Sequence, residues 1–197
     1  MSPRPRAFAV IGAALLAATA MQVLTGCAPV VIAAGVGATA MVANDRRSTG
    51  AQVDDESIEL KINTAAGSRW GNDIHLNVTS YNATVLLTGE VASTAVRDDI
   101  VNVAKTTDRV KSVENFLVIG PLTDFSARTN DSYITSKVKA RFVESDKFSA
   151  THVKVVTERS VVYLMGIVSR DEGAAAAQVA ATTAGVARVV KVFEYTN

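Results

Sequence analysis

The stretches Val85–Val91 (VLLTGEV) and Val162–Val168 (VYLMGIV) decide the fold. Each is rich in β-branched and aliphatic residues, and each carries a glycine at its fifth position, Gly89 and Gly166. Runs of this kind predict strands. A glycine inside such a run suggests a bulge or the close approach of a neighbouring backbone. The repetition predicts that the chain builds the same strand twice.

Segments that flank the two stretches are repeated in the same order. Ser57–Ile62 corresponds to Tyr133–Val138, His75–Val78 to His152–Val155, and Val110–Val113 to Val186–Val189. The first pair has apolar residues at helical spacing, and the second pair alternates as a strand does. Because a solenoid of this period needs about three units to be stable, two units predict two small tandem domains.

Each unit has the order helix, strand, strand, helix, strand. The tight connection between the first two strands is predicted at Tyr81-Asn82 and at Glu158-Arg159. Ser169 followed by Glu172 is a candidate capping box for the second helix of the second unit. The predicted fold class is therefore α+β. It consists of two tandem α-β-β-α-β domains, each a small mixed sheet with two helices on one face.

The N-terminus has the parts of a bacterial secretory signal. Arg4 and Arg6 precede the apolar run Ala7–Val23, and Leu24-Thr25-Gly26-Cys27 follows it. This ending resembles the lipobox of bacterial lipoproteins, which implies cleavage before Cys27 and acylation of that residue. The alternative is a plain membrane anchor. Cys27 is the single cysteine of the chain, so an intramolecular disulfide is excluded.

The predicted organisation has five parts. Residues 1–26 form a cleaved signal peptide, and residues 27–53 form the lipidated cysteine with its tether. Residues 54–120 form the first domain, 121–130 the linker that begins with Pro121, and 131–197 the second domain. The apolar run Ala28–Ala43 is too short and too rich in glycine and alanine to favour a spanning helix, so we interpret it as a tether. A buried helix is the alternative.

The repeated order, with Leu-Thr-Gly-Glu-Val in one unit and Leu-Met-Gly-Ile-Val in the other, resembles the BON domain of bacterial envelope proteins. Two such domains behind a lipobox resemble the dual BON-domain lipoproteins of Gram-negative outer membranes, most closely over Ser48–Asp55 and Asp131–Val138. The resemblance implies a lipid-anchored protein on the periplasmic face of the outer membrane. It also implies a role in envelope integrity and binding of anionic phospholipid through the second domain. Tyr133 stands where a member of this family carries tryptophan, and the smaller ring implies weaker membrane affinity.

A candidate phospholipid site lies on the first helix of the second domain. Tyr133, Lys137 and Arg141 form one stripe, which would place an aromatic ring at the membrane interface beside two long basic side chains. Residues 131–154 hold five basic and three acidic residues, whereas residues 54–77 hold two basic and five acidic ones. The second domain is thus the one suited to an anionic surface. The alternative is an ordinary solvated helix face.

The sequence contains no pattern typical of catalysis. His75 and His152 occupy matched positions in separate units and are therefore not expected to converge, as a catalytic or metal pair with acids or other ligands would require. Asp54-Asp55-Glu56 is interpreted as the acidic first turn of a helix. We therefore expect no enzyme activity, cofactor, metal or small-molecule substrate, and the net charge of +1 gives no indication of nucleic acid binding. The alternative function is a scaffold that binds outer-membrane assembly, cell-wall remodelling or cell-division proteins.

Overall fold

The computed structural model describes residues 45–196. The predicted signal peptide 1–26, Cys27 and the apolar run 28–43 lie outside the described residues. Among residues 45–196, no helix combines the length and the apolar character needed to cross a membrane.

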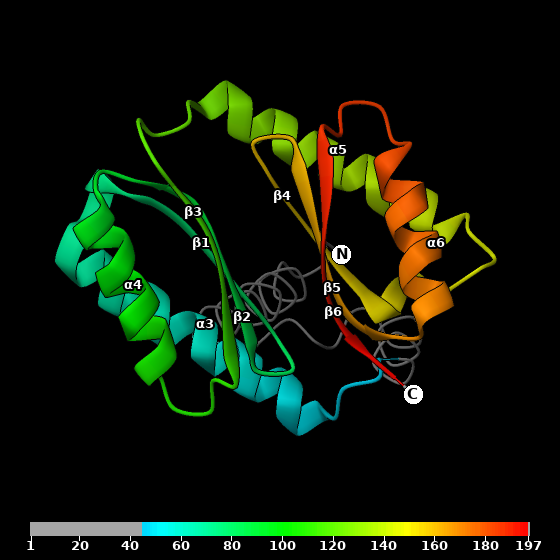
Figure 1. Ribbon diagram of the computed structural model, residues 1–197, viewed down its shortest axis with the longest axis horizontal. Helices are drawn as coiled ribbons and strands as arrows, with labels where there is room; N and C mark the ends of the chain where they lie inside the picture. The colour runs from blue at the N-terminus through cyan, green and yellow to red at the C-terminus, as the bar shows by residue number, and fades with distance from the viewer. Residues whose placement is uncertain (1–44, 197) are drawn as a thin grey trace, which may run out of the picture. The chain divides into compact units, whose positions relative to one another are not determined.

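The first repeat forms a mixed three-stranded sheet with two helices. Its elements are α3 (Thr49–Trp70), a short 3₁₀ turn (Gly71–Asp73), β1 (His75–Tyr81), β2 (Thr84–Val91), α4 (Thr94–Thr106) and β3 (Ser112–Ile119). The strand order is β1-β2-β3, in which β1 runs antiparallel and β3 parallel to β2. Because a parallel return needs a crossover, α4 joins β2 to β3 across one face of the sheet (Figure 1).

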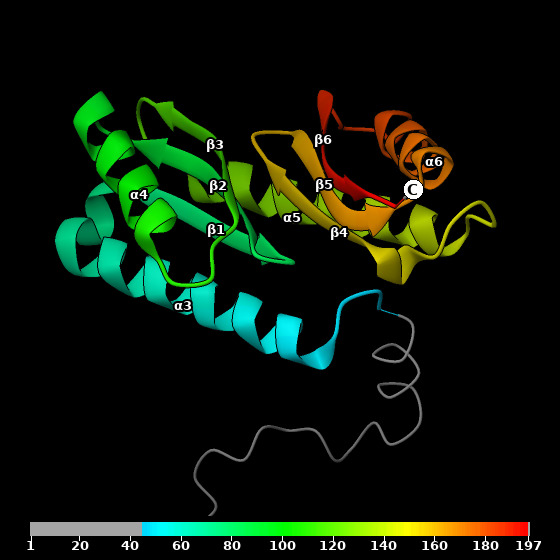
Figure 2. The same ribbon diagram turned by 60° about the horizontal axis from the view of Figure 1, so that its bottom comes forward.

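The second repeat has the same order. Its elements are α5 (Phe125–Val143), a short 3₁₀ turn (Ala150–His152), β4 (Val153–Glu158), β5 (Val161–Val168), α6 (Arg170–Ala181) and β6 (Arg188–Tyr195). Strand β5 again lies in the middle, antiparallel to β4 and parallel to β6. Both helices lie on one side of this sheet, as Figure 2 shows. The predicted α+β fold with two α-β-β-α-β units is confirmed.

The central strands β2 and β5 are buried along most of their length and are mostly apolar, although β2 also contains Thr84, Thr88 and Glu90. Val85 and Leu87 point into a core with α3 and α4, and Val162 and Leu164 point into the matching core with α5 and α6. The residues between them point the other way. Leu86, Tyr163 and Met165 join Tyr81 in a third buried cluster between the two sheets. A near-continuous apolar run is what burial on two faces requires.

The two repeated glycines allow the first two strands of each sheet to pair closely. A Cβ atom on Gly89 would lie 1.9 Å from the carbonyl oxygen of His75, and one on Gly166 would lie 2.3 Å from that of His152. Gly89 also has a φ of 115°, which side chains disfavour. The close backbone approach expected from the sequence is therefore present at the same position in both repeats.

The first helix of each repeat begins before the boundary expected for its domain. Helix α3 starts at Thr49, inside the predicted tether, because the Ser48 hydroxyl accepts a hydrogen bond from the Ala51 amide. Helix α5 starts at Phe125, inside the predicted linker, where the Asp124 carboxylate caps the Ala127 amide at 2.7 Å. A polar N-cap satisfies amides that have no partner within the helix. The capping box of Ser169 and Glu172 on α6 is confirmed.

Candidate functional site

The outward side of α5 carries three exposed apolar side chains. Phe125 is 80% exposed, Tyr133 61% and Val143 76%. Phe125 and Val143 are separated by about five full helical turns and so point in the same direction, with Tyr133 about a quarter turn away. Their neighbours Ile134 and Phe142 are buried on the opposite side, against the sheet. The exposed apolar residues therefore share one broad face of the helix.

The predicted stripe of Tyr133, Lys137 and Arg141 does not point to solvent as a unit. Lys137 Nζ lies 4.6 Å from the centre of the Tyr133 ring and also donates to the Ala184 carbonyl. Arg141 is turned towards α6. Its Nη1 atom donates to the Val179 carbonyl at 2.9 Å and to the Thr183 hydroxyl at 2.8 Å. A cation at the C-terminal end of a helix stabilises carbonyls that lack a partner there.

Each repeat holds its strand-turn-strand connection with a buried aspartate from its first helix. Asp131 accepts hydrogen bonds from the Arg159 amide at 2.7 Å and from the Ser160 amide at 2.8 Å. Asp55 does the same for Asn82 and Ala83, each at 2.8 Å. The interpretation of Asp55 as part of an acidic first turn is wrong, because Ser48 caps α3 and places Asp55 two turns into the helix.

The sequence contained a signal for this role that our interpretation missed. Asp55 and Asp131 occupy matched places, each three residues before a matched isoleucine, Ile58 or Ile134. The two-residue turns that they hold have positive φ at both positions, 51° and 67° at Asn82 and Ala83, and 52° and 60° at Arg159 and Ser160. Turns of this type suit tight hairpins, but they need support when the residues are not glycine.

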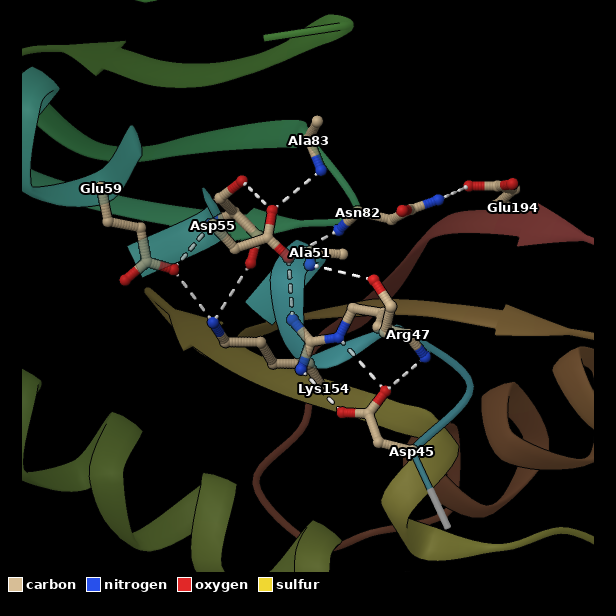
Figure 3. Close-up of polar contacts among 11 residues, drawn as sticks. Asp45, Arg47, Ala51, Asp55, Glu59, Asn82, Ala83, Lys154 and Glu194 are labelled. Carbon is tan, nitrogen blue, oxygen red and sulfur yellow. Dashed lines mark hydrogen bonds and ion pairs between the residues drawn. The ribbon is translucent and has the colours of Figure 1, made fainter. Parts of the chain in front are cut away.

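Polar contacts join the two repeats around the apolar cluster between the sheets. Lys154 on β4 donates to the Glu59 carboxylate on α3 at 3.0 Å (Figure 3). Beside this contact, Arg47 bonds Asp45 and Asp55, both within the first repeat. Asn82 donates to Glu194 at 2.6 Å. The Phe116 and Tyr163 rings, one from each repeat, lie 5.0 Å apart between centroids.

Two hydrogen bonds from Arg46 connect the segment before α3 to the start of α6. Both Nη atoms of Arg46 donate to the Glu172 carboxylate, at 2.7 and 2.9 Å. The hydrogen bond from Arg46, which outweighs the opposing effect of burial, lowers the pKa of Glu172 to about 2. Ser169 adds to this shift through its backbone amide.

His75 meets two buried carboxylates at one end of this junction. Its Nδ1 atom lies 3.0 Å from Glu90 Oε2 and 3.7 Å from Glu158 Oε1, which comes from the second repeat. The Thr123 hydroxyl donates to Glu90 Oε2 at 3.0 Å. Sequence reasoning did not find this cluster, because Glu158 belongs to the other repeat and only the packing of the sheets brings its strand end to His75.

The two carboxylates of this cluster have opposite pKa shifts. Burial raises the pKa of Glu158 to about 6, and the nearby charges of Glu90 and Asp131 add to the rise, while His75 and Arg159 oppose it. Burial acts in the same direction on Glu90, but hydrogen bonds from Thr123 and His75 outweigh it and leave the pKa of Glu90 below its ordinary value. Of the two carboxylates, Glu158 is thus the one that takes up a proton first as the pH falls.

The sequence is similar to those of known bacterial proteins over most of its length. The profile of the BON domain matches residues 54–121 and 130–197. The chain is 38% identical to the outer membrane lipoprotein DolP of Haemophilus influenzae over 185 residues, which cover 93% of this chain and 94% of that protein.

Two further relatives are more distant. The chain is 33% identical to the 21 kDa hemolysin of Actinobacillus pleuropneumoniae, over 77% of this chain and 79% of that protein. It is 31% identical to the osmotically-inducible protein Y of Escherichia coli, over 59% of each chain. The repeated fold and these matches together show that this chain belongs to the BON domain family and carries two BON domains.

Proposed function

We propose that this protein is held at the periplasmic face of the outer membrane by lipid on Cys27, and that the outer face of α5 binds anionic phospholipid there. In this role it maintains the integrity of the envelope by binding rather than by catalysis. The domain boundaries expected from the sequence, with the second domain as the lipid-binding one, are part of the proposal.

The proposed anchor rests on the N-terminal sequence. Leu24-Thr25-Gly26-Cys27 ends a basic and apolar signal, and several acyl chains on one cysteine would hold a protein firmly, since each buried methylene contributes about 0.8 kcal/mol. Mass spectrometry of the mature protein from its native host should find an acylated N-terminus at Cys27. An unmodified chain that begins at Met1 contradicts the anchor.

The observation that carries the phospholipid site is the exposure of Phe125, Tyr133 and Val143 on one side of α5. Large apolar side chains gathered on one face favour contact with a membrane or a partner. Lys137 and Lys139 lie on either side of that face, where an anionic surface attracts each base by about 1 kcal/mol. We revise the predicted site accordingly. Tyr133 and Lys137 remain in it, and Arg141 supports the packing of α5 on α6.

The test is vesicle binding by a chain that begins at Asp45, which lacks the anchor and keeps both domains. The whole unit is needed because the isolated second domain would expose Tyr163 and Met165. The double variant Phe125→Ala/Tyr133→Ala should bind vesicles containing phosphatidylglycerol at least about tenfold more weakly, since a buried aromatic side chain contributes about 1.5–3 kcal/mol. Lys139→Glu should weaken binding at low salt, and its effect should shrink as salt rises.

The matched control is Leu60→Ala on α3, where a side chain that is 68% exposed lies on the acidic first domain. This variant should bind as the unaltered chain does. Circular dichroism should confirm that all variants are folded. Equal vesicle binding by the unaltered chain and the folded double variant contradicts a lipid surface on α5. That outcome favours the scaffold function, in which the same face meets another protein of the envelope.

A further inference from the structure

The end of the domain junction at His75 has the spacing of a metal site. One ligand atom each from His75, Glu90 and Glu158 can be chosen so that all three lie within 4.8 Å of one another. The two distances from His75 Nδ1 are 3.0 Å to Glu90 and 3.7 Å to Glu158. Ligands at the bond lengths of tetrahedral zinc lie about 3.3 Å apart, so the observed distances fall on either side of that value.

The carboxylates at this site are buried and incompletely paired. The Glu90 side chain is 0% exposed and that of Glu158 6% exposed. Glu90 Oε1 and Glu158 Oε1 have no hydrogen-bond partner among the described residues, although Arg159 Nη1 lies 3.6 Å from the former. The two buried carboxylates thus meet one imidazole and one partly exposed arginine, and a carboxylate is costly to bury unless it is paired or coordinates a metal.

The opposite end of the same junction shows that the fold does not need this charge. Tyr81 ends β1 as Glu158 ends β4, and Ile167 follows Gly166 as Glu90 follows Gly89. At the second end, Ile167 packs against the apolar cluster that contains Tyr81. The apolar side chains of Tyr81 and Ile167 therefore occupy one end of the junction, whereas the carboxylates of Glu158 and Glu90 occupy the other. The carboxylates are a feature of one site and not a requirement of the repeated packing.

The types of ligand atom at this site indicate which class of metal ion it would bind. One imidazole nitrogen with two carboxylate oxygens suits zinc and other divalent transition metals. Magnesium and calcium prefer a larger set of oxygen ligands. A cavity of about 390 Å³ lies beside this site, and its lining includes His75, Asn77 and Glu158. Thr123 Oγ1, 3.3 Å from His75 Nδ1, holds the Glu90 carboxylate in place as an outer-shell partner does.

We propose that His75, Glu90 and Glu158 bind one divalent transition-metal ion, with zinc as the best match, and that this ion bridges the two BON domains. Two ligands come from the first domain and one from the second, so the ion links β1 and β2 to the end of β4. The site is independent of the lipid surface on α5.

The test is metal binding by the full chain, purified in detergent, treated with EDTA and desalted. Zinc chloride should bind at one equivalent by calorimetry. At about 100 times its dissociation constant, it should raise the melting temperature by about 5 °C or more. Magnesium chloride at the same concentration should not. Cobalt(II), which reports its coordination by visible absorption, should give a spectrum typical of four or five ligands including nitrogen.

Glu158→Gln should remove the zinc shift and the cobalt spectrum while the protein stays folded, because it keeps the shape of the side chain. His152→Ala is the matched control, since its imidazole stands at the equivalent position with one carboxylate, Glu172, 3.7 Å away. That variant should bind zinc as the unaltered chain does. All measurements are repeated with Cys27→Ala to remove the thiol. The proposal is overturned if the unaltered chain binds no zinc equivalent, or if Glu158→Gln binds zinc equally well.

Discussion

Asp131 is a buried side chain whose two oxygens serve a turn 28 and 29 residues further along the chain. The turn residues Arg159 and Ser160 have positive φ, and their amides face the helix rather than water. Because the carboxylate accepts both amides, it fixes the turn and the register of β4 on β5 together. The same arrangement at Asp55 makes this aspartate the residue that most directly joins helix to hairpin in each repeat.

Removal of this side chain should destabilise the protein. Asp131→Ala leaves two amides without an acceptor and should lower the free energy of unfolding by about 2 kcal/mol, since each unmade hydrogen bond costs about 1–3 kcal/mol unless water replaces it. Asp131→Asn keeps one acceptor oxygen and should fall between. Urea unfolding measures both. Asp146→Ala, at an exposed loop position, should change stability by less than about 0.5 kcal/mol. An equal effect of Asp131→Ala and Asp146→Ala contradicts the role.

At the scale of one element, α6 begins with a carboxylate that has two roles. Glu172 accepts the Ser169 amide at 2.7 Å to complete the capping box, and it also accepts the Arg46 guanidinium. The low pKa of Glu172, about 2 against 4.5, means that its charged form is favoured by folding. This stability is present above the unfolded pKa of 4.5 and is lost as the pH falls towards 2.

Glu172→Gln should keep the cap and lose the ion pair with Arg46. At pH 7 the variant should be less stable by at most about 1 kcal/mol, because water screens a pair near the surface. The difference from the unaltered chain should shrink as the pH falls from 4.5 towards 3. Urea unfolding across this range measures it, with Asp171→Asn as an exposed neighbour that lacks the pair. A difference that stays constant from pH 7 to pH 3 rejects the linkage to Glu172.

The elements were largely predictable from sequence because their causes are local. The strands Val85–Val91 and Val162–Val168, the capping box at Ser169 and the position of the glycines all depend on nearby residues. The start of α3 was missed because Ser48 lies in a polar stretch with no acid at the matching third position, where Ala51 stands instead. The partners of Lys137 and Arg141 were also missed, since they belong to the end of another helix.

At the scale of the whole chain, the junction between the domains could not be predicted from sequence. Leu86 and Tyr163 alternate with the residues that face the helices and make the second face of each sheet apolar. The sequence did not indicate that this face is covered or which surface covers it. His75 and Glu158 lie 83 residues apart, and only the packing of one sheet on the other brings their side chains within 3.7 Å. The spacing of apolar residues along a helix or strand does not indicate which distant side chains come into contact.

The junction should make the two domains unfold together. Trp70, the single tryptophan, packs on the core of the first domain and reports on it alone, whereas far-UV circular dichroism reports on both. In the unaltered chain, the urea transition followed by Trp70 fluorescence should coincide with the one followed by circular dichroism. Met165→Asp, on the second domain, buries a charge at the junction and should lower stability by about 3 kcal/mol or more. The two transitions should then separate.

Leu60→Asp, at a side chain that is 68% exposed, should leave the two transitions coincident. If Met165→Asp also leaves them coincident, with the midpoint unchanged, then the contacts between the sheets contribute little to stability.

The position of the apolar cluster between the sheets also determines at which point of synthesis or export the chain can bury it. Strands β1 to β3 are complete by Ile119, but the strands that cover their open face begin at Val153. A chain that emerges from a ribosome or an export channel with its N-terminus first can therefore close the first helix-covered core while the face around Leu86 is still open to water. During that interval the face is a surface on which two incomplete chains can associate, and rapid arrival of the second domain protects against aggregation.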